Sequence, residues 1–282
     1  MTKMYVHYHV HKDLLAQCSN LYSYAHLTDH YFLNRNDGKY DRSHYDPAVF
    51  QRNYLDRPDR LRYRDKNHPH LYRDVVLNME HHRVWQPNHP NWKQLCQEYI
   101  NITRMTKAAG QEVSVYGISF GWAEFQIDWN LGRYSNWINN RPETRQKSVE
   151  KYREYQRKGE LLEERAAIIA DKFRNEIDNF ILSCYAPYPF DEDNDWKMDA
   201  WKNYLRSTVD RARRHLPEKG ISAFVQPQFV GKSGKWQPMS LSVWSQTLEY
   251  LYDLGVDRIY VFSLRDVEFA PGWEKPIFGL AE

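Results

Sequence analysis

The strongest constraint in this sequence is the alternation of short apolar segments with amphipathic helical ones. Six segments rich in β-branched or aromatic residues are predicted strands, at residues 4–10, 74–80, 112–118, 179–185, 221–229 and 258–263. Helical periodicity lies between several of them, at residues 92–109, 196–216 and 241–254, and two of these helices stop at Gly110 and Gly255. Strand, helix, glycine and strand is the pattern of parallel βαβ units.

This pattern predicts one α/β domain over residues 1–282, with the sheet closed into a TIM-like (β/α) barrel. A standard barrel has about eight strands. Six are clear here, so one or two more are expected within residues 11–73 or 119–141, and the barrel is predicted to have fewer than eight regular strands. An open doubly wound sheet is the alternative. Neither GxGxxG nor GxxxxGK followed by Ser or Thr occurs, which removes the usual nucleotide-binding reasons for that fold.

Two segments are longer than the connections that a minimal barrel requires. Residues 11–73 are polar and rich in Tyr, Arg, Asp and His, and we expect an irregular insertion over the barrel face. Residues 142–178 are strongly charged and helical, with an interruption expected at Gly159. This long helical segment suits a solvated surface helix, a homodimer contact or a lid.

Charge and cysteine usage restrict the partners. The formal net charge of +2 argues against nucleic acid and an anionic membrane surface. No apolar stretch resembles a signal peptide or a membrane span, so a cytoplasmic protein is expected, although a phage-borne or lysis-released enzyme would look the same. Three distant cysteines without a CxxC pattern predict neither a disulfide framework nor a cysteine metal site.

Candidate site residues follow the strand ends, because β/α folds place reactive groups at the carboxyl ends of their strands. Asn78 and Glu80 are two residues apart in one strand and therefore face the same side. Partial burial would raise the pKa of Glu80 and suit it to general acid/base catalysis. The candidates for hydrogen bonding to a substrate are Tyr116, Tyr185, Gln226 and Gln228, and those for stacking on sugar rings are Trp85, Trp122 and Trp129.

The order strand, Glu80, Trp85, helix and a later strand ending at Tyr185 resembles the (β/α)-barrel glycoside hydrolases of the hyaluronidase and chitinase type. The resemblance spans residues 74–265 in outline. It implies a glycosidase that cleaves a polysaccharide or glycan, with N-acetylhexosamine units as one option and with no cofactor. In those families an Asp-x-Glu pair acts by substrate-assisted retention, and Asn78 and Glu80 match that pair, with Tyr185 matching the active-site tyrosine.

Asn78 departs from the family pattern, because an Asp there would orient the substrate's acetamido group. This leaves open a mechanism with two protein carboxylates. Asp266 is the predicted second carboxylate, with Glu124 or Asp128 as alternatives.

Two other functions remain open. His7, His9 and His11 alternate at the end of the first predicted strand, which resembles the His-x-His opening of amidohydrolases and related phosphoesterases. His7 and His9, completed by Asp266, would form a zinc or manganese site of a metal-dependent hydrolase. Alternatively, the aromatic and Arg-rich residues 21–73 would bind a glycan or another protein without catalysis.

Overall fold

The computed structural model describes residues 2–18, 20–28, 31–33, 35–36, 39–40, 45–57, 74–78, 86–116, 122–186, 195–230, 236–262 and 269–281. Within these ranges only the backbone is described at residues 7–12, 35–36, 39–40, 122–125, 195 and 230.

Seven parallel strands close into a barrel in the order of the chain. They are β1 (Lys3–His7), β2 (Tyr22–Leu27), β5 (Asp74–Asn78), β6 (Glu112–Tyr116), β7 (Asn179–Ser183), β8 (Gly220–Val225) and β11 (Arg258–Val261). Each strand pairs with the next along the sequence, and β11 pairs with β1 at the seam. The prediction of a TIM-like α/β barrel with fewer than eight strands is therefore confirmed.

The additional strand lies in the polar segment before residue 73. It is β2, which pairs with β1 on one side and β5 on the other. The other segment that was a candidate for it, residues 119–141, contains helix α5 (Trp122–Asn140) instead. The rest of the polar segment includes α2 (Pro47–Phe50), a π-helical turn η2 (Gln51–Leu55) and a small hairpin of β3 (Arg35–Asn36) and β4 (Lys39–Tyr40).

The first predicted strand is shorter than expected. It ends at His7, and helix α1 (Tyr8–Gln17) begins at the next residue. Buried Leu14 and Leu15 attach this helix to the core. His9 therefore lies in a helix, and the argument that alternation along one strand places His7 and His9 on the same side was wrong. The side chains of His7 and His9 lie outside the described residues.

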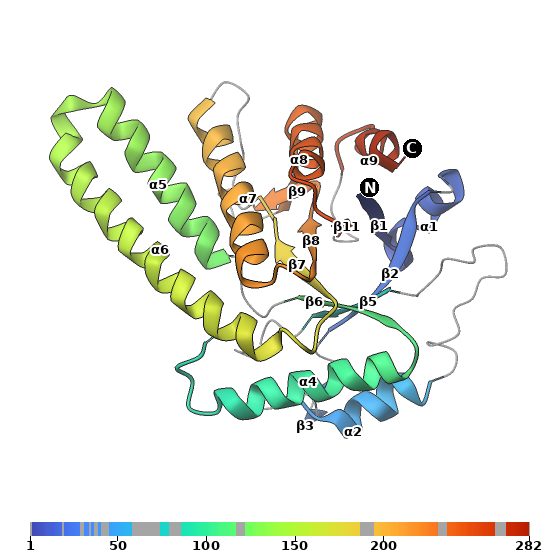
Figure 1. The fold of residues 1–282 in the computed structure, drawn as a ribbon. Helices are drawn as coiled ribbons and strands as arrows, with labels where there is room; N and C mark the ends of the chain where they lie inside the picture. The colour runs from blue at the N-terminus through green and yellow to red at the C-terminus, as the bar shows by residue number, and fades with distance from the viewer. Residues whose placement is uncertain are drawn as a thin grey trace.

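The helices predicted between strands are present. They are α4 (Trp92–Ala108), α7 (Asp195–His215) and α8 (Leu241–Asp253), and a short α9 (Lys275–Ala281) lies beside β1 (Figure 1). Gly110 and Gly255 follow α4 and α8 with φ of 79° and 67°, a left-handed conformation that favours glycine at helix ends. None of the helices in the described part of the chain is long and apolar enough to cross a bilayer.

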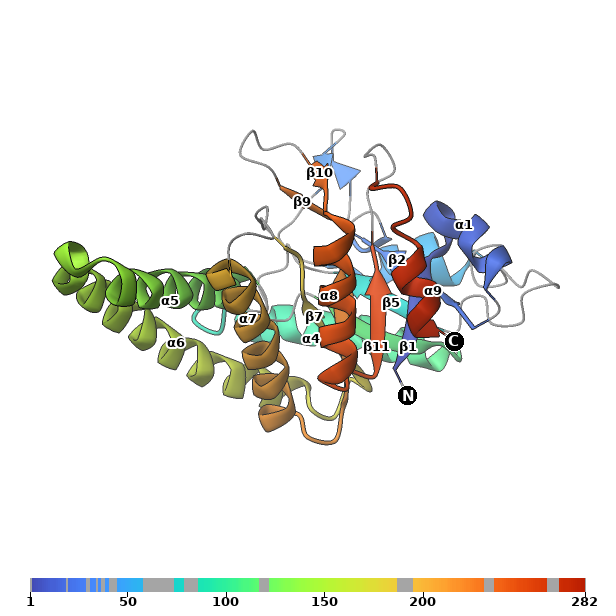
Figure 2. The same ribbon diagram turned by 90° about the horizontal axis from the view of Figure 1, so that it is seen from above.

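A long helical hairpin extends from one side of the barrel. It consists of α5 and α6 (Arg145–Phe173), joined by the 3-10 turn η4 (Pro142–Thr144), and both views show it projecting beyond the other helices (Figures 1 and 2). The α6 helix continues through Gly159, so the expected interruption is wrong. Glu163 of α6 anchors the hairpin to α7, because its carboxylate pairs with Arg211, Arg214 and His215.

Candidate functional site

The barrel interior is filled mainly by aromatic rings. The buried inner cluster consists of Tyr5, Tyr24, Val76, Tyr116, Ile181, Phe224 and Tyr260. Tyr24 meets Tyr260 edge to face at 5.1 Å between ring centroids, and Phe224 stacks on Tyr260 at 6.2 Å. Aromatic pairs at these separations stabilise a core beyond the area that they bury. They also give the barrel a floor of flat apolar surfaces.

The amino-terminal end of the barrel is closed by a buried polar network around Asp74, which is 1% exposed. Asp74 accepts hydrogen bonds from Ser114 Oγ at 2.9 Å and from Tyr260 OH at 2.7 Å, and it forms an ion pair with Arg258. Asn179 Nδ2 donates to Ser114 Oγ at 2.7 Å. Each of these groups has a partner, as burial requires. The polar residues at the amino-terminal end of the barrel therefore stabilise the fold.

The carboxyl end of the barrel brings together Tyr116 and Tyr185, two of the predicted site residues. Tyr116 ends β6, and its hydroxyl donates to Ser183 Oγ across the neighbouring strand at 3.2 Å. Tyr185 is half-buried, and its ring lies 6.4 Å from Tyr116 and 5.7 Å from Phe224, edge-on to the latter. Tyr185 thus packs against the inner aromatic cluster, of which Tyr116 is a member.

Three predicted amides accompany the phenols. Alternation along β5 places Asn78 on the same side as Val76, which belongs to the inner cluster. Gln226 follows β8 and lies on the side of Phe224 by the same reasoning. Gln226 is 2% exposed, and its Nε2 donates to Oε1 of buried Gln228 at 3.4 Å. Each amide carries both donor and acceptor atoms, as recognition of sugar hydroxyls requires.

Two buried tyrosines of the helix layer hold the strand ends at this mouth. Tyr99 of α4 donates its hydroxyl to the carbonyl oxygen of Tyr116 at 2.8 Å and lies 3.2 Å from that of Leu77. Tyr204 of α7 donates to the carbonyl oxygen of Ser183. Carbonyls at the ends of a parallel sheet need such partners when they are buried. The positions of Asn78 and Tyr116 are therefore fixed from outside the barrel as well as from within.

His26 is a mouth residue that the sequence reasoning missed. It shares the inward face of β2 with Tyr22 and Tyr24, and its ring lies 5.6 Å from Phe224 and 5.4 Å from Phe262. Burial lowers its pKa from 6.5 to about 4, so the imidazole is neutral at physiological pH. The alternation Tyr-x-Tyr-x-His was the available signal for this strand.

Several predicted residues lie outside the described part of the chain. They are Glu80, Trp85 and Asp266, together with the side chains of Trp122, Glu124, His7 and His9. The acid/base and metal-ligand roles assigned to them stay predictions.

Two helix residues do not have the site positions that the sequence suggested. Asp128 of α5 accepts a hydrogen bond from Ser207 of α7, and Trp129 packs on Trp196 of α7 at 5.2 Å. Both therefore belong to the contact between these helices and not to the barrel interior. The reason is that residues 122–140 form a helix of the outer layer.

The described residues form no metal-binding group, and two of their three cysteines are buried. Among them no group of three or more His, Cys, Asp and Glu side chains could hold a metal ion. The Cys18, Cys96 and Cys184 thiols are free. Burial raises the pKa of Cys96 to about 12 and that of Cys184 well above its usual value, so both remain protonated and poor nucleophiles.

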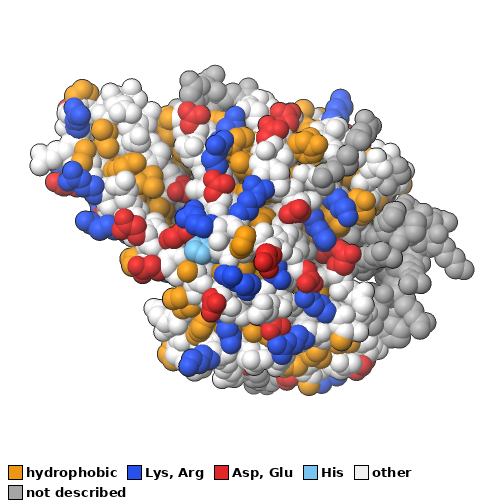
Figure 3. Space-filling model, viewed as in Figure 1, with side chains coloured by type: hydrophobic (Ala, Val, Ile, Leu, Met, Phe, Trp, Pro, Cys, Tyr) orange, Lys and Arg blue, Asp and Glu red, His pale blue; other side chains and the backbone are white. Residues whose placement is uncertain are grey.

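The surface carries interspersed charges of both signs. On the face shown in Figure 3, Lys and Arg side chains alternate with Asp and Glu over the helices, and no field of one sign covers that face. This distribution agrees with the near-zero net charge of the sequence.

Comparisons with known proteins identify similar structures but no family. No family profile matches the chain, and no curated protein sequence matches it either. A bee venom hyaluronidase is similar in structure, with 12% identity, a TM-score of 0.48, and coverage of 94% of this chain and 92% of that one. Its complex with a hyaluronic acid tetramer gives 10% identity and a TM-score of 0.47 over 94% and 91% of the two chains.

A psychrophilic glycoside hydrolase family 10 endo-β-1,4-xylanase is also similar, at 11% identity and a TM-score of 0.38, over 89% of this chain and 65% of that one. Hyaluronidase-type barrels, which the sequence resembles, are thus among the similar structures.

Proposed function

We propose that this protein is a glycoside hydrolase that cleaves a polysaccharide or glycan at the carboxyl end of its barrel. The observation that carries the proposal is the combination of an aromatic floor with a hydrogen-bonding rim at that end. Tyr185 and Asn78 are partly exposed at this end, and Phe224 and the amides of Gln226 and Gln228 lie buried beneath them. Sugars present the complementary surfaces, with apolar ring faces and hydroxyl edges.

Glu80 is the proposed general acid and base. It comes two residues after Asn78 in the sequence, next to the strand end that Tyr99 holds. A carboxylic acid above an aromatic floor is partly desolvated, which raises its pKa and keeps a proton available for the glycosidic oxygen. Asp266 is the proposed second carboxylate, which would act as nucleophile or as base toward water. Asn78, Tyr185 and Gln226 are proposed to hold the sugar in place.

The test is Glu80→Gln, which keeps the shape of the side chain and removes its acidity. We expect release of reducing ends from a polysaccharide panel, with and without N-acetylhexosamine units, to fall about a hundredfold or more. The matched control is Glu112→Gln, the same change at the opposite end of the barrel, where the side chain is 54% exposed. Full activity of a folded Glu80→Gln protein would end the proposal.

The same samples separate the two alternatives. Stoichiometric zinc or manganese, with activity lost on addition of EDTA, would favour the metal-dependent hydrolase that uses His7, His9 and Asp266. Glycan binding without release of reducing ends would favour a non-catalytic binding protein. The proposed glycosidase requires activity that is indifferent to the chelator.

A second copy of this chain is the proposed partner of the outer face of α6. Leu161 and Ile168 are 62% and 49% exposed there, seven residues apart on one face. Residues 145–158 carry six basic and two acidic side chains, whereas residues 160–173 carry four acidic and two basic ones. Antiparallel association of two α6 helices would pair opposite charges. Leu161→Lys should then lower the apparent mass in light scattering, whereas a monomeric wild type would exclude this partner.

A further inference from the structure

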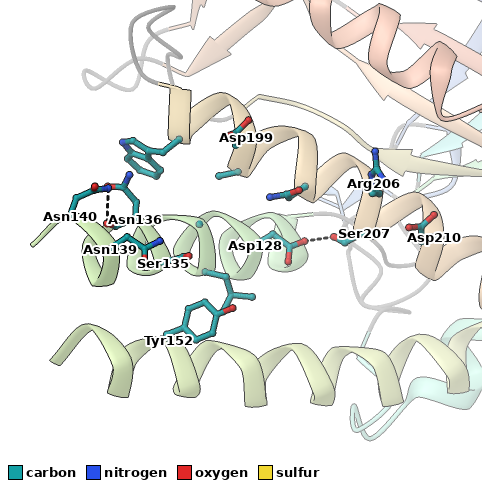
Figure 4. Close-up of a pocket in the computed structure, with 15 residues that line it drawn as sticks. Asp128, Ser135, Asn136, Asn139, Asn140, Tyr152, Asp199, Arg206, Ser207 and Asp210 are labelled. Atoms are coloured by element: carbon teal, nitrogen blue, oxygen red, sulfur yellow. Dashed lines mark hydrogen bonds between the residues drawn. The ribbon is translucent and has the colours of Figure 1, made fainter. Parts of the chain in front are cut away.

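A polar cavity of about 610 Å³ lies between α5 and α7, with Tyr152 of α6 on its border (Figure 4). The two helices meet closely at Gly132, where an added Cβ would lie 2.5 Å from Cβ of Ala200. Both residues also line the cavity, so the contact forms part of its wall. The cavity has the size of typical small-ligand sites, which span roughly 300–1,000 Å³.

Uncharged hydrogen-bonding groups dominate the lining. Figure 4 shows Ser135, Asn136, Asn139 and Asn140 along α5, and Asn203 joins them from α7. Asn140 Nδ2 donates to the backbone oxygen of Asn136 at 3.1 Å. Four amides in one cavity offer donors and acceptors side by side, the arrangement that neighbouring sugar hydroxyls match.

An indole completes this arrangement. Trp196 of α7 lines the cavity, and its ring is half-buried and packed against Trp129 of α5 at 5.2 Å. This packing holds the ring in one orientation before any ligand arrives, which lowers the entropy cost of binding. A fixed indole among amides suits a ligand that has both an apolar face and a hydroxyl edge.

The charge of the lining selects against anions. Three aspartates, Asp128, Asp199 and Asp210, face one cation, Arg206. Asp128 is engaged by Ser207, and Arg206 Nε donates to Tyr250 OH at 3.0 Å. The excess of negative charge disfavours phosphates, nucleic acid and uronic-acid polymers. No metal-binding group of three or more His, Cys, Asp and Glu occurs among the described residues, so a cation is not the expected occupant.

We propose that this cavity is a second glycan-binding site, which takes a neutral oligosaccharide. The choice of a glycan rests on the function proposed above. The α5 and α7 helices follow the neighbouring strands β6 and β7, so both begin on the side of the barrel where those strands end. A polymer engaged at the mouth and at this cavity gains affinity from the linkage of the two sites, which short substrates lack.

The test is calorimetric binding of neutral hexasaccharides (cello-, xylo- and chitohexaose) and of an anionic hyaluronan hexasaccharide. At least one neutral probe should bind wild type, and its affinity should fall about tenfold in Asn139→Ala and in Trp196→Ala. Trp196→Phe, which retains an aromatic ring against Trp129, should bind better than Trp196→Ala. The matched controls are Asn130→Ala and Trp137→Ala, which alter the same hairpin outside the cavity and should bind as wild type does.

Three results would overturn the inference: no neutral probe binds, folded cavity variants bind with wild-type affinity, or the hyaluronan probe binds more tightly than the neutral ones. The Glu80→Gln protein distinguishes a wrong inference about this cavity from a wrong glycosidase proposal. If Glu80→Gln stays fully active while Asn139→Ala loses binding, only the glycosidase proposal falls. If activity depends on Glu80 and the cavity variants still bind normally, only the second site falls.

Discussion

The two ends of the barrel use the same kinds of side chain for different purposes. At the amino-terminal end, Asp74, Arg258 and Ser114 form a closed network in which each group is paired with its neighbours. At the carboxyl end, Tyr116, Tyr185 and Gln226 stand on an aromatic floor next to loops. The difference teaches that buried polar residues stabilise one end of the barrel, whereas those at the carboxyl end of the strands are the candidates for function.

Removing the centre of the amino-terminal network tests this contrast with the largest expected effect. Asp74→Ala removes the buried carboxylate that Arg258 and Tyr260 share, and breaking such a buried pair costs about 3–5 kcal/mol in the free energy of unfolding. The measurement is urea denaturation. The control Glu112→Gln alters the exposed partner of the same arginine and should cost less than about 1 kcal/mol. Equal effects of the two variants would contradict the assignment.

The pH dependence of stability tests the burial of His26. Its pKa of about 4 in the folded protein lies below the unfolded value of 6.5, so the unfolded chain binds more protons between these values. Stability is therefore full above pH 6.5 and falls as pH decreases toward 4, by about 3 kcal/mol from this group. His26→Gln should flatten this part of the stability profile. Identical profiles for wild type and His26→Gln would refute this.

Tyr185→Phe tests whether a hydroxyl at the carboxyl end of the barrel has a different role from one deeper in the aromatic interior. Loss of the mouth hydroxyl should lower kcat/KM on a polysaccharide by about tenfold and leave the melting temperature nearly unchanged. Tyr24→Phe is the matched control, because Tyr24 lies deeper and its hydroxyl donates to the carbonyl oxygen of Val261 at 3.3 Å. That variant should lose some stability and keep its activity. The opposite result would place the site elsewhere.

The barrel was predictable from sequence where one face of a strand is aliphatic. Strand β5 directs Val75 and Leu77 toward the core outside the barrel, and strand β11 does the same with Ile259 and Val261. Both strands are therefore clear apolar runs in the sequence. Strand β2 lacks this contrast, because Tyr22, Tyr24 and His26 line its inner face and Ser23 and Ala25 lie opposite. Its existence depends on pairing with β1 and β5, which no local pattern shows.

The positions of the candidate site residues were predictable in part, again because some strands form apolar runs. Tyr185 and Gln226 stand directly after apolar strands, so their place at the mouth followed from the topology. The pair Asp74 and Arg258 joins residues 184 positions apart, and Trp129 belongs to a helix that resembled a possible strand region. Contacts of this kind arise from closure of the sheet and from helix packing, and sequence spacing does not contain them.

The bonds from Tyr99 and Tyr204 to the strand ends have a thermodynamic consequence for the mouth. Because each phenol ties a strand end to a helix, the rim loses its conformational freedom when the protein folds. A ligand that arrives later does not have to order it. Folding of the whole barrel therefore supplies the free energy that orders this rim, and the helices that carry Tyr99 and Tyr204 lower the entropy cost of binding any ligand there.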